Sequence, residues 1–194
     1  MLFRLFAFLC LAGVSFADVP RPLVDVPILY PNGKKLSIKT KYRGRVVVIV
    51  MIATTCNSCV KTIDLLTKMQ QQFGPRGLVV VGAVVDEQNP KFTVGPWLTR
   101  HRPPFEFGYL EKAELIKLAD IPPGKRPFVP ILMFIDKKGQ VRYQAYGDDP
   151  FMNEKDKAIP AIINSLLMGQ EGPMTATQQV GRDGKPLPPP AAKK

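Results

Sequence analysis

Side chains that bind metals are scarce in this chain of 194 residues, which has three cysteines and one histidine. A structural zinc site takes four ligands from cysteine, histidine and carboxylate side chains, and a catalytic zinc site takes three. Cys10 lies in the apolar N-terminal segment, and His101 is far along the chain from the remaining pair, Cys56 and Cys59. An intramolecular zinc site is therefore short of ligands, and we expect neither a metal nor another cofactor.

Long apolar runs are also absent, apart from a short one at the N-terminus. The chain opens MLFRLFAFLCLAGVSFADVP, with one arginine, an apolar run from Leu5 to Val14, and small residues before Asp18. This pattern is typical of a secretory signal peptide, residues 1–17, cleaved after Ala17. The run is too short to span a bilayer comfortably, although an uncleaved N-terminal anchor is the alternative. We expect a periplasmic or secreted protein with no stable membrane insertion after cleavage.

Acidic residues are outnumbered by basic ones, which gives a formal net charge of +11. A basic balance can indicate a nucleic-acid interface. Here the basic residues are scattered, with the densest stretch between Lys34 and Arg45, and no aromatic stacking pattern or DNA-reading motif accompanies them. A solvated basic face is the favoured interpretation, and we expect no nucleic-acid partner.

Hydrophobic periodicity changes repeatedly between strand and helix patterns along the chain. The run RVVVIVMIA after Gly44 is typical of a strand buried on both faces of a sheet. From Asn57 to Phe73, apolar residues recur at helical spacing before a Gly74-Pro75 stop. We expect two strands around a turn within 26–38, further strands at 45–53, 78–85, 131–135 and 141–146, and helices at 57–73, 96–101, 112–118 and 155–168.

This order of elements predicts an α/β fold in which helices flank a mixed β-sheet, with an N-terminal β-hairpin extension. One domain, residues 18–169, is long enough to bury a core. The segment 170–194 is rich in proline, glycine and lysine and has few large apolar residues, so we predict a disordered tail.

The pair Cys56 and Cys59 stands where a buried strand is expected to give way to a helix. At a helix N-terminus, the dipole and the unpaired N–H groups stabilise a thiolate on Cys56. Cys59, one turn further on, could then attack a mixed disulfide on Cys56 and release the partner. A purely structural disulfide is less consistent with this spacing, because closing a two-residue loop gains little stability. The sequence predicts a redox-active pair.

Three stretches together resemble a known family. These are NGKKLSIKTKYRGRVVVIVMIATTCNSC, LVVVGAVVDE and FVPILMFIDKKGQVRYQAYG, the last of which is similar to a V-P-x-x-F-x-I-D-x-x-G hairpin. Over about Leu29 to Met168 the chain resembles the TlpA/ResA-type thioredoxin-like proteins of the wider AhpC/TSA-redoxin superfamily. The resemblance implies a thioredoxin-like fold and a thiol–disulfide oxidoreductase with Cys56 as nucleophile and Cys59 as resolving cysteine.

The same resemblance implies a partner-binding surface beside the cysteines. In the family, the proline that matches Pro130 follows a cis peptide bond next to the C-x-x-C motif, so Val129 would offer its N–H and C=O to an incoming polypeptide. Thr55, which stands before the first cysteine, would also face the partner. The implied partners are cysteine-containing proteins and an unknown redox partner.

The chain departs from the family pattern at positions that matter for turnover. Where family members have W-A-x-W before the first cysteine, this chain has Ile52–Thr55 and lacks both tryptophans. An acidic residue often found three positions after the second cysteine is Thr62 here, and the buried carboxylate position known from thioredoxin matches Val50. Asp86 and Glu87 are the nearest candidates to deprotonate Cys59, although capping of the next helix is their favoured role.

Three alternatives to an oxidoreductase stay open with unequal support. A thiol peroxidase needs a P-x-x-x-[ST]-x-x-C loop, and no proline precedes Cys56 in the matching stretch. Copper-handling redoxins use C-x-x-x-C and a distant histidine, whereas the spacing here is C-x-x-C. A non-catalytic binding module with a thioredoxin-like fold is favoured by the missing tryptophans and acids. The direction of exchange, reductive or oxidative, is not fixed by these residues.

Overall fold

A computed structural model describes residues 19–170 of the chain. The predicted signal peptide, residues 1–17, and positions 171–194 of the predicted tail lie outside the described residues. Within residues 19–170, no helix combines the length and apolarity needed to cross a membrane.

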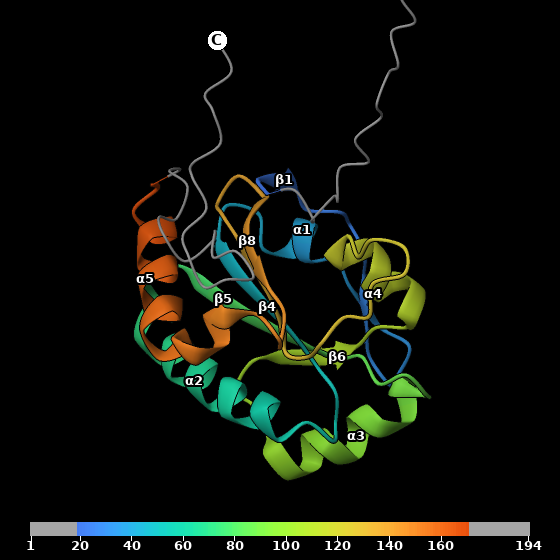
Figure 1. The fold of residues 1–194 in the computed structure, drawn as a ribbon. Helices are drawn as coiled ribbons and strands as arrows, with labels where there is room; N and C mark the ends of the chain where they lie inside the picture. Colours follow the sequence, from blue (N-terminus) through green and yellow to red (C-terminus); the bar gives the residue numbers. More distant parts are fainter. Residues whose placement is uncertain (1–18, 171–194) are drawn as a thin grey trace, which may run out of the picture.

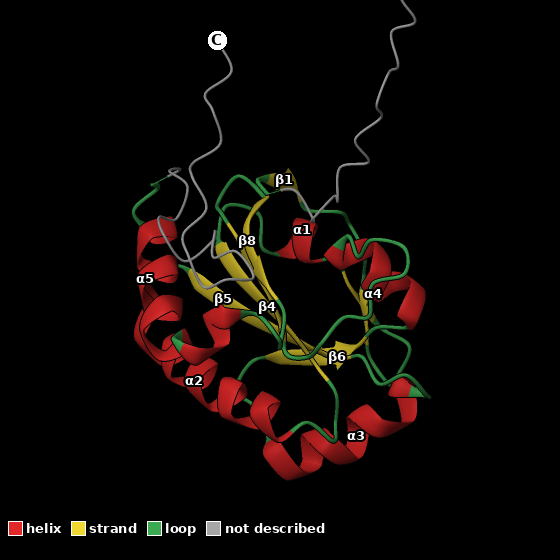
Figure 2. Ribbon diagram, in the orientation of Figure 1, coloured by secondary structure: helices red, strands yellow, loops and turns green. Residues whose placement is uncertain are grey.

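One sheet of eight strands forms the centre of the described domain, in the order β1-β8-β7-β4-β5-β6-β2-β3 (Figures 1 and 2). The strands are β1 (Arg21–Pro22), β2 (Ile28–Leu29), β3 (Lys35–Leu36), β4 (Val46–Ile52), β5 (Leu78–Val84), β6 (Glu106–Tyr109), β7 (Ile131–Ile135) and β8 (Gln140–Ala145). β4 pairs in parallel with β5 and antiparallel with β7, and β5 pairs in parallel with β6. The predicted mixed sheet is therefore confirmed.

The helices cover both faces of this sheet. They are α1 (Ile38–Lys41), α2 (Asn57–Phe73), α3 (Pro90–His101), α4 (Lys112–Ala119) and α5 (Lys155–Leu167), with short 3-10 turns at Gly74–Arg76 and Pro150–Asn153. Alternate residues of β4 point to opposite faces. Val48 and Val50 pack with α2, α3 and α5 in one core cluster, while Ile49 packs with α1 and α4 in the other. This explains why every residue of β4 is buried.

The N-terminal hairpin predicted within 26–38 is confirmed by the antiparallel pair β2 and β3. Tyr30 donates its N–H to the carbonyl of Lys34, and Gly33 closes the turn with a positive φ of 83°. β2 also pairs with the end of β6, so the hairpin extends the sheet at its edge. Gly108 makes this approach possible, because a Cβ there would lie 2.3 Å from the carbonyl oxygen of Leu29.

The predicted helix over 57–73 coincides with α2, and most other elements differ from their predicted bounds by one or two residues. Larger differences are also present. α3 begins at Pro90, six residues before the predicted start, and the short elements β1, α1 and β6 were not predicted. β6 has four residues and holds its place through parallel pairing with β5, from Val81↔Glu106 to Val84↔Tyr109, which is a long-range interaction.

Candidate active site

The parallel strands β4, β5 and β6 end at the same edge of the sheet, where α2 begins (Figure 1). The cysteine pair lies at the start of α2. Cys56 is the N-cap of α2 and has an extended backbone. Its Sγ accepts the backbone N–H of Cys59 at 3.2 Å, the role that serine or aspartate oxygen often takes at a helix start. The first cysteine therefore lies where the helix N-terminus favours negative charge on sulfur.

Cys56 and Cys59 form a disulfide, and their Cα atoms are 5.3 Å apart. The two sulfurs differ in access, because Cys56 is half-buried whereas Cys59 is 0% exposed and belongs to the core cluster of α2. Ser58 places its Oγ 3.3 Å from the Sγ of Cys56. An incoming group can thus approach Cys56 from solvent, while Cys59 is buried in the core.

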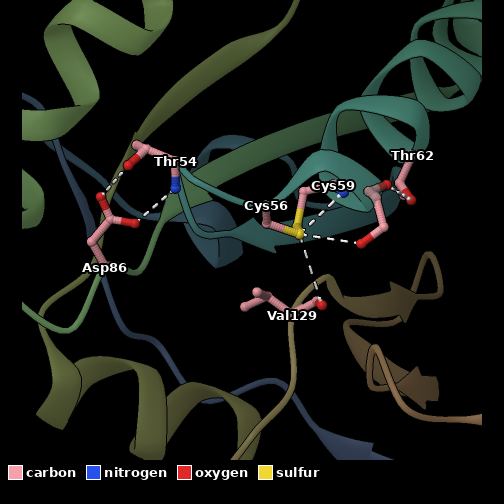
Figure 3. The surroundings of a disulfide bond; sticks show 7 residues. Thr54, Cys56, Cys59, Thr62, Asp86 and Val129 are labelled. Atoms are coloured by element: carbon pink, nitrogen blue, oxygen red, sulfur yellow. Dashed lines mark hydrogen bonds between the residues drawn. A yellow bond between two sulfur atoms is a disulfide. The ribbon is translucent and has the colours of Figure 1, made fainter.

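The segment before β7 runs past the sulfur of Cys56. The peptide bond between Val129 and Pro130 is cis, as the resemblance implied. The carbonyl oxygen of Val129 lies 4.0 Å from the Sγ of Cys56, so the structure brings Val129 beside the disulfide (Figure 3). Pro130 is buried behind it, and Thr55, the residue before Cys56, is exposed.

Gly147 holds the backbone of Phe128 and Val129 in place, and the sequence analysis did not identify it as a site residue. Its N–H donates to the carbonyl of Phe128 at 2.8 Å. A Cβ at position 147 would lie 2.2 Å from the carbonyl oxygen of Val129 and 2.6 Å from its carbonyl carbon. Glycine is required here by the close approach of two backbones. The sequence signal was a glycine just after the last predicted strand.

Asp86 has a different role from the one expected. Its carboxylate accepts the backbone N–H of Thr54 at 2.8 Å and the hydroxyl of Thr54 at 2.7 Å. The N-cap of α3 is Asn89, which makes no side-chain capping hydrogen bond, so the predicted helix-capping role of Asp86 and Glu87 is wrong. Asp86 instead binds the loop that precedes Cys56. Figure 3 shows Thr54 between Asp86 and the disulfide.

Glu87 forms an ion pair with Arg126 at 3.1 Å, and both side chains are about three-quarters exposed, at 76% and 78%. Because the pair is exposed, its energetic contribution is small. It nevertheless links the loop after β5 to the segment that leads to Val129. The residues that follow β5 therefore contact two segments near the cysteines. Asp86 binds the loop before Cys56, and Glu87 pairs with the segment that leads to Val129.

The structure buries both residues that stand where the family pattern has a carboxylate. Val50 is 0% exposed in the core, and Thr62 is 1% exposed. The hydroxyl of Thr62 donates to the carbonyl of Ser58 at 3.1 Å, so it is satisfied within α2. Neither position supplies a side chain that titrates near the cysteines. In the part of the chain that the structure describes, no group of three or more His, Cys, Asp or Glu residues could hold a metal ion.

Comparison with known proteins agrees with this geometry. A family model described as Redoxin matches residues 17–159. The chain belongs to the Redoxin family. A comparison of this redoxin with curated proteins found no match.

Solved structures place this redoxin among thioredoxin-like folds. It is similar to a thiol:disulfide interchange protein of the thioredoxin family from Chlorobium tepidum TLS, with a TM-score of 0.60 and 23% identity over 78% of this chain and 99% of that one. The thioredoxin domain of a thiol-disulfide oxidoreductase from Bacteroides vulgatus gives a TM-score of 0.55 and 16% identity over 73% and 97% of the two chains.

An uncharacterized conserved protein from Geobacillus kaustophilus gives a TM-score of 0.66 and 19% identity over 84% of this chain and 89% of that one. At these identities the likeness concerns the fold. The predicted thioredoxin-like α/β fold is confirmed.

Proposed function

We propose that this redoxin is an exported thiol–disulfide oxidoreductase that exchanges disulfides with cysteine-containing proteins. The single observation that carries the proposal is the unequal access of the two sulfurs. Cys56 is reachable at the N-terminus of α2 beside the carbonyl of Val129, and Cys59 is fully buried behind it. A disulfide with one accessible and one buried sulfur suits transfer to an external partner better than a structural role.

The proposed reaction has two exchange steps. In the reduced protein, the Cys56 thiolate attacks one sulfur of a partner disulfide, and the other partner sulfur leaves as a thiolate. The Cys59 thiolate then attacks the Cys56 sulfur, the partner's second sulfur leaves with its electron pair, and the Cys56–Cys59 disulfide forms. The protein is oxidised by two electrons and the partner is reduced. A partner dithiol drives the same steps in reverse.

The net direction depends on the reduction potential of the pair. The loop residues Asn57 and Ser58 are neutral and exposed, and residues in this loop tune the thiolate. A potential of about −270 mV would indicate a reductase, and one of about −120 mV would indicate an oxidant. Equilibration with glutathione followed by alkylation of free thiols measures this value.

Export is the part of the proposal that rests on the sequence of residues 1–17. Protein isolated from its native host should begin at Asp18, because cleavage is expected after the small residue Ala17. N-terminal sequencing checks this. An intact Met1 would contradict cleavage and leave the N-terminal anchor as the better explanation.

Trapping of partner proteins tests the proposed exchange. Cys59→Ser should accumulate covalent adducts through Cys56, because the buried resolving sulfur is missing, and dithiothreitol should release them. Cys56→Ser should form none and serves as the matched control. Alkylation of the reduced protein across pH should modify Cys56 first, because the helix N-terminus favours its thiolate. Absence of adducts with Cys59→Ser would contradict the oxidoreductase.

A non-catalytic binding module is the second candidate, and one observation favours it. The positions of Val50 and Thr62 carry no carboxylate to assist the buried thiol of Cys59. A binding module would hold partners without forming a disulfide to them. Partner complexes that survive in the Cys56→Ser variant would therefore support this candidate over exchange.

A further inference from the structure

Phe128 is a large apolar side chain that the fold leaves 52% exposed. Among the residues that the structure describes, the exposed large apolar side chains are Phe92, Ile116, Phe128 and Met168. A single exposed apolar residue is common on protein surfaces and needs no explanation by itself. The position of Phe128 is what distinguishes it, because it directly precedes Val129, whose carbonyl oxygen lies beside the Sγ of Cys56.

The backbone around Phe128 is fixed even though its side chain is exposed. The carbonyl of Phe128 accepts the N–H of Gly147, and the backbone of Gly147 lies against Val129. The side chain is therefore presented from a held segment and not from a freely moving loop. Because the backbone is already held, less freedom is lost when a partner covers this side chain, which favours binding.

Any partner joined to Cys56 must come close to Phe128. The carbonyl oxygen of Val129 lies 4.0 Å from the Sγ of Cys56, and consecutive Cα atoms are about 3.8 Å apart. The partner's cysteine is thus placed one residue away from Phe128 along the segment. A partner residue one or two positions from this cysteine along an extended chain lies about 3–7 Å further on, which is comparable to the step from Val129 to Phe128.

The surface on the α2 side of the sulfur is polar by contrast. Thr55, Asn57 and Ser58 are all exposed there, and Ile52 is fully buried beneath. Among the described residues, Phe128 is therefore the exposed large apolar side chain that adjoins Val129 in the chain. It offers a partner more apolar area than the half-buried Val129 does.

We infer that Phe128 is a specificity-determining residue, which selects partner segments that carry an aliphatic or aromatic residue within two positions of the reacting cysteine. This inference rests on the proposed exchange with cysteine-containing proteins. The segment that fits is an extended one, with its cysteine accessible, as in an unfolded chain or an exposed loop. Small hydrophilic thiols gain nothing from Phe128.

The preference is measured with two synthetic peptides that differ in the residues beside one cysteine. One peptide has leucine on both sides and the other has serine, and each cysteine carries a thionitrobenzoate leaving group. In the Cys59→Ser protein, the Cys56 thiolate attacks the peptide sulfur, and the coloured aryl thiolate leaves with its electron pair. Its release gives the rate for each peptide.

The leucine peptide should react roughly tenfold faster than the serine peptide, as expected for burial of apolar side chains on an aromatic ring. Phe128→Ser should reduce this ratio to about one, and Phe128→Leu should preserve most of it, which separates apolar contact from damage to the fold. Phe92→Ser is the matched control, because Phe92 is 73% exposed in the first turn of α3 and belongs to a different segment from Val129. Its ratio should equal that of the parent.

Equal rates for the two peptides in the parent would overturn the inference, as would an unchanged ratio in Phe128→Ser or an equal loss in Phe92→Ser. Failure of the proposed function gives a different result. In that case the Cys59→Ser protein traps no partner proteins, although the activated peptides and Ellman's reagent still modify Cys56.

Discussion

Asp86 accepts both polar donors of Thr54, the backbone N–H at 2.8 Å and the hydroxyl at 2.7 Å. The two hydrogen bonds join the residues that follow β5 to the loop between β4 and α2. Thr54 is two residues before Cys56, so the bonds determine how the chain enters the helix that carries the disulfide. The carboxylate of Asp86 was expected to cap α3. Instead it holds the backbone of the loop that leads to Cys56.

Replacement of Asp86 by alanine should destabilise the protein. Both donors of Thr54 are partly buried and would lose their acceptor, which should lower the free energy of unfolding by about 1–3 kcal/mol. Urea denaturation of the oxidised protein measures the change. Thr54→Val is the matched control: it removes the hydroxyl bond and keeps the backbone one, so its loss should be smaller. Equal stability of Asp86→Ala and the parent would show that the two bonds contribute nothing.

Elements with a strong local pattern were predictable from the sequence. The continuous β-branched run of β4 and the helical spacing of α2 reflect burial of one strand on both faces and of one helix along one face. Cys56 and Cys59 could be placed for the same reason, because the junction between these two elements determines their position. Val129 and Pro130 were found through their resemblance to a family motif and not through any periodicity.

Features that depend on long-range contacts were not predictable. Strand β6 is defined by pairing with β5 and the hairpin, and its four residues carry too little pattern to identify it alone. The start of α3 was missed because its N-cap, Asn89, has a positive φ of 50° and makes no side-chain capping hydrogen bond. This is not the usual helix start that a sequence pattern indicates. The partner of Asp86 and the contact of Gly147 with Val129 likewise join distant parts of the chain.

Thr62 should be a structural residue and not a proton acceptor for Cys59. Its buried hydroxyl donates to the carbonyl of Ser58 within α2, so Thr62→Val keeps the shape and removes a bond that the helix does not require. The free energy of unfolding should change by less than about 1 kcal/mol, and the rate at which Cys59 resolves a mixed disulfide should stay the same. Stopped-flow fluorescence with a model disulfide measures this rate. A large fall in the rate without a change in stability would assign Thr62 a role in proton transfer.

Glu106 should make stability depend on acid pH. Burial tends to raise the pKa of its carboxyl, but hydrogen bonds from Lys41 and Tyr42 outweigh burial and hold the pKa below the ordinary value. A lowered pKa means that the folded state favours the charged carboxylate, so this stabilisation is present above the unfolded pKa and is lost as pH falls through the folded pKa. Lys41 is 50% exposed and Glu106 is 35% exposed, so the contribution is about 1 kcal/mol or less.

Glu106→Gln tests this linkage, because glutamine cannot titrate. The parent should exceed the variant in free energy of unfolding at about pH 7, and the difference should shrink toward about pH 3 as the carboxylate of the parent takes up a proton. Urea denaturation at the two pH values gives both differences. The same difference at each pH would mean that shape, and not charge, accounts for the loss.

Gly147→Ala should displace the backbone of Val129, which lies beside Cys56. The added Cβ would lie 2.2 Å from the carbonyl oxygen of Val129, and because the atoms that it meets are backbone atoms, the segment has to move. We expect a loss of about 1–3 kcal/mol in the free energy of unfolding, as for other overpacked sites, and slower exchange between Cys56 and protein disulfides. Urea denaturation and adduct formation in the Cys59→Ser background measure the two effects.

Gly95→Ala is the control for that substitution. Gly95 lies inside α3, where an added Cβ meets no atom within 4 Å, so the same methyl group should stabilise the helix by up to about 1 kcal/mol and leave exchange at Cys56 unchanged. The two glycines thus separate the effect of a methyl group in open space from the effect of one pressed on the segment beside Cys56. If Gly147→Ala matched Gly95→Ala in stability and exchange, the Val129 segment would have to be free to shift, and Gly147 would not position it.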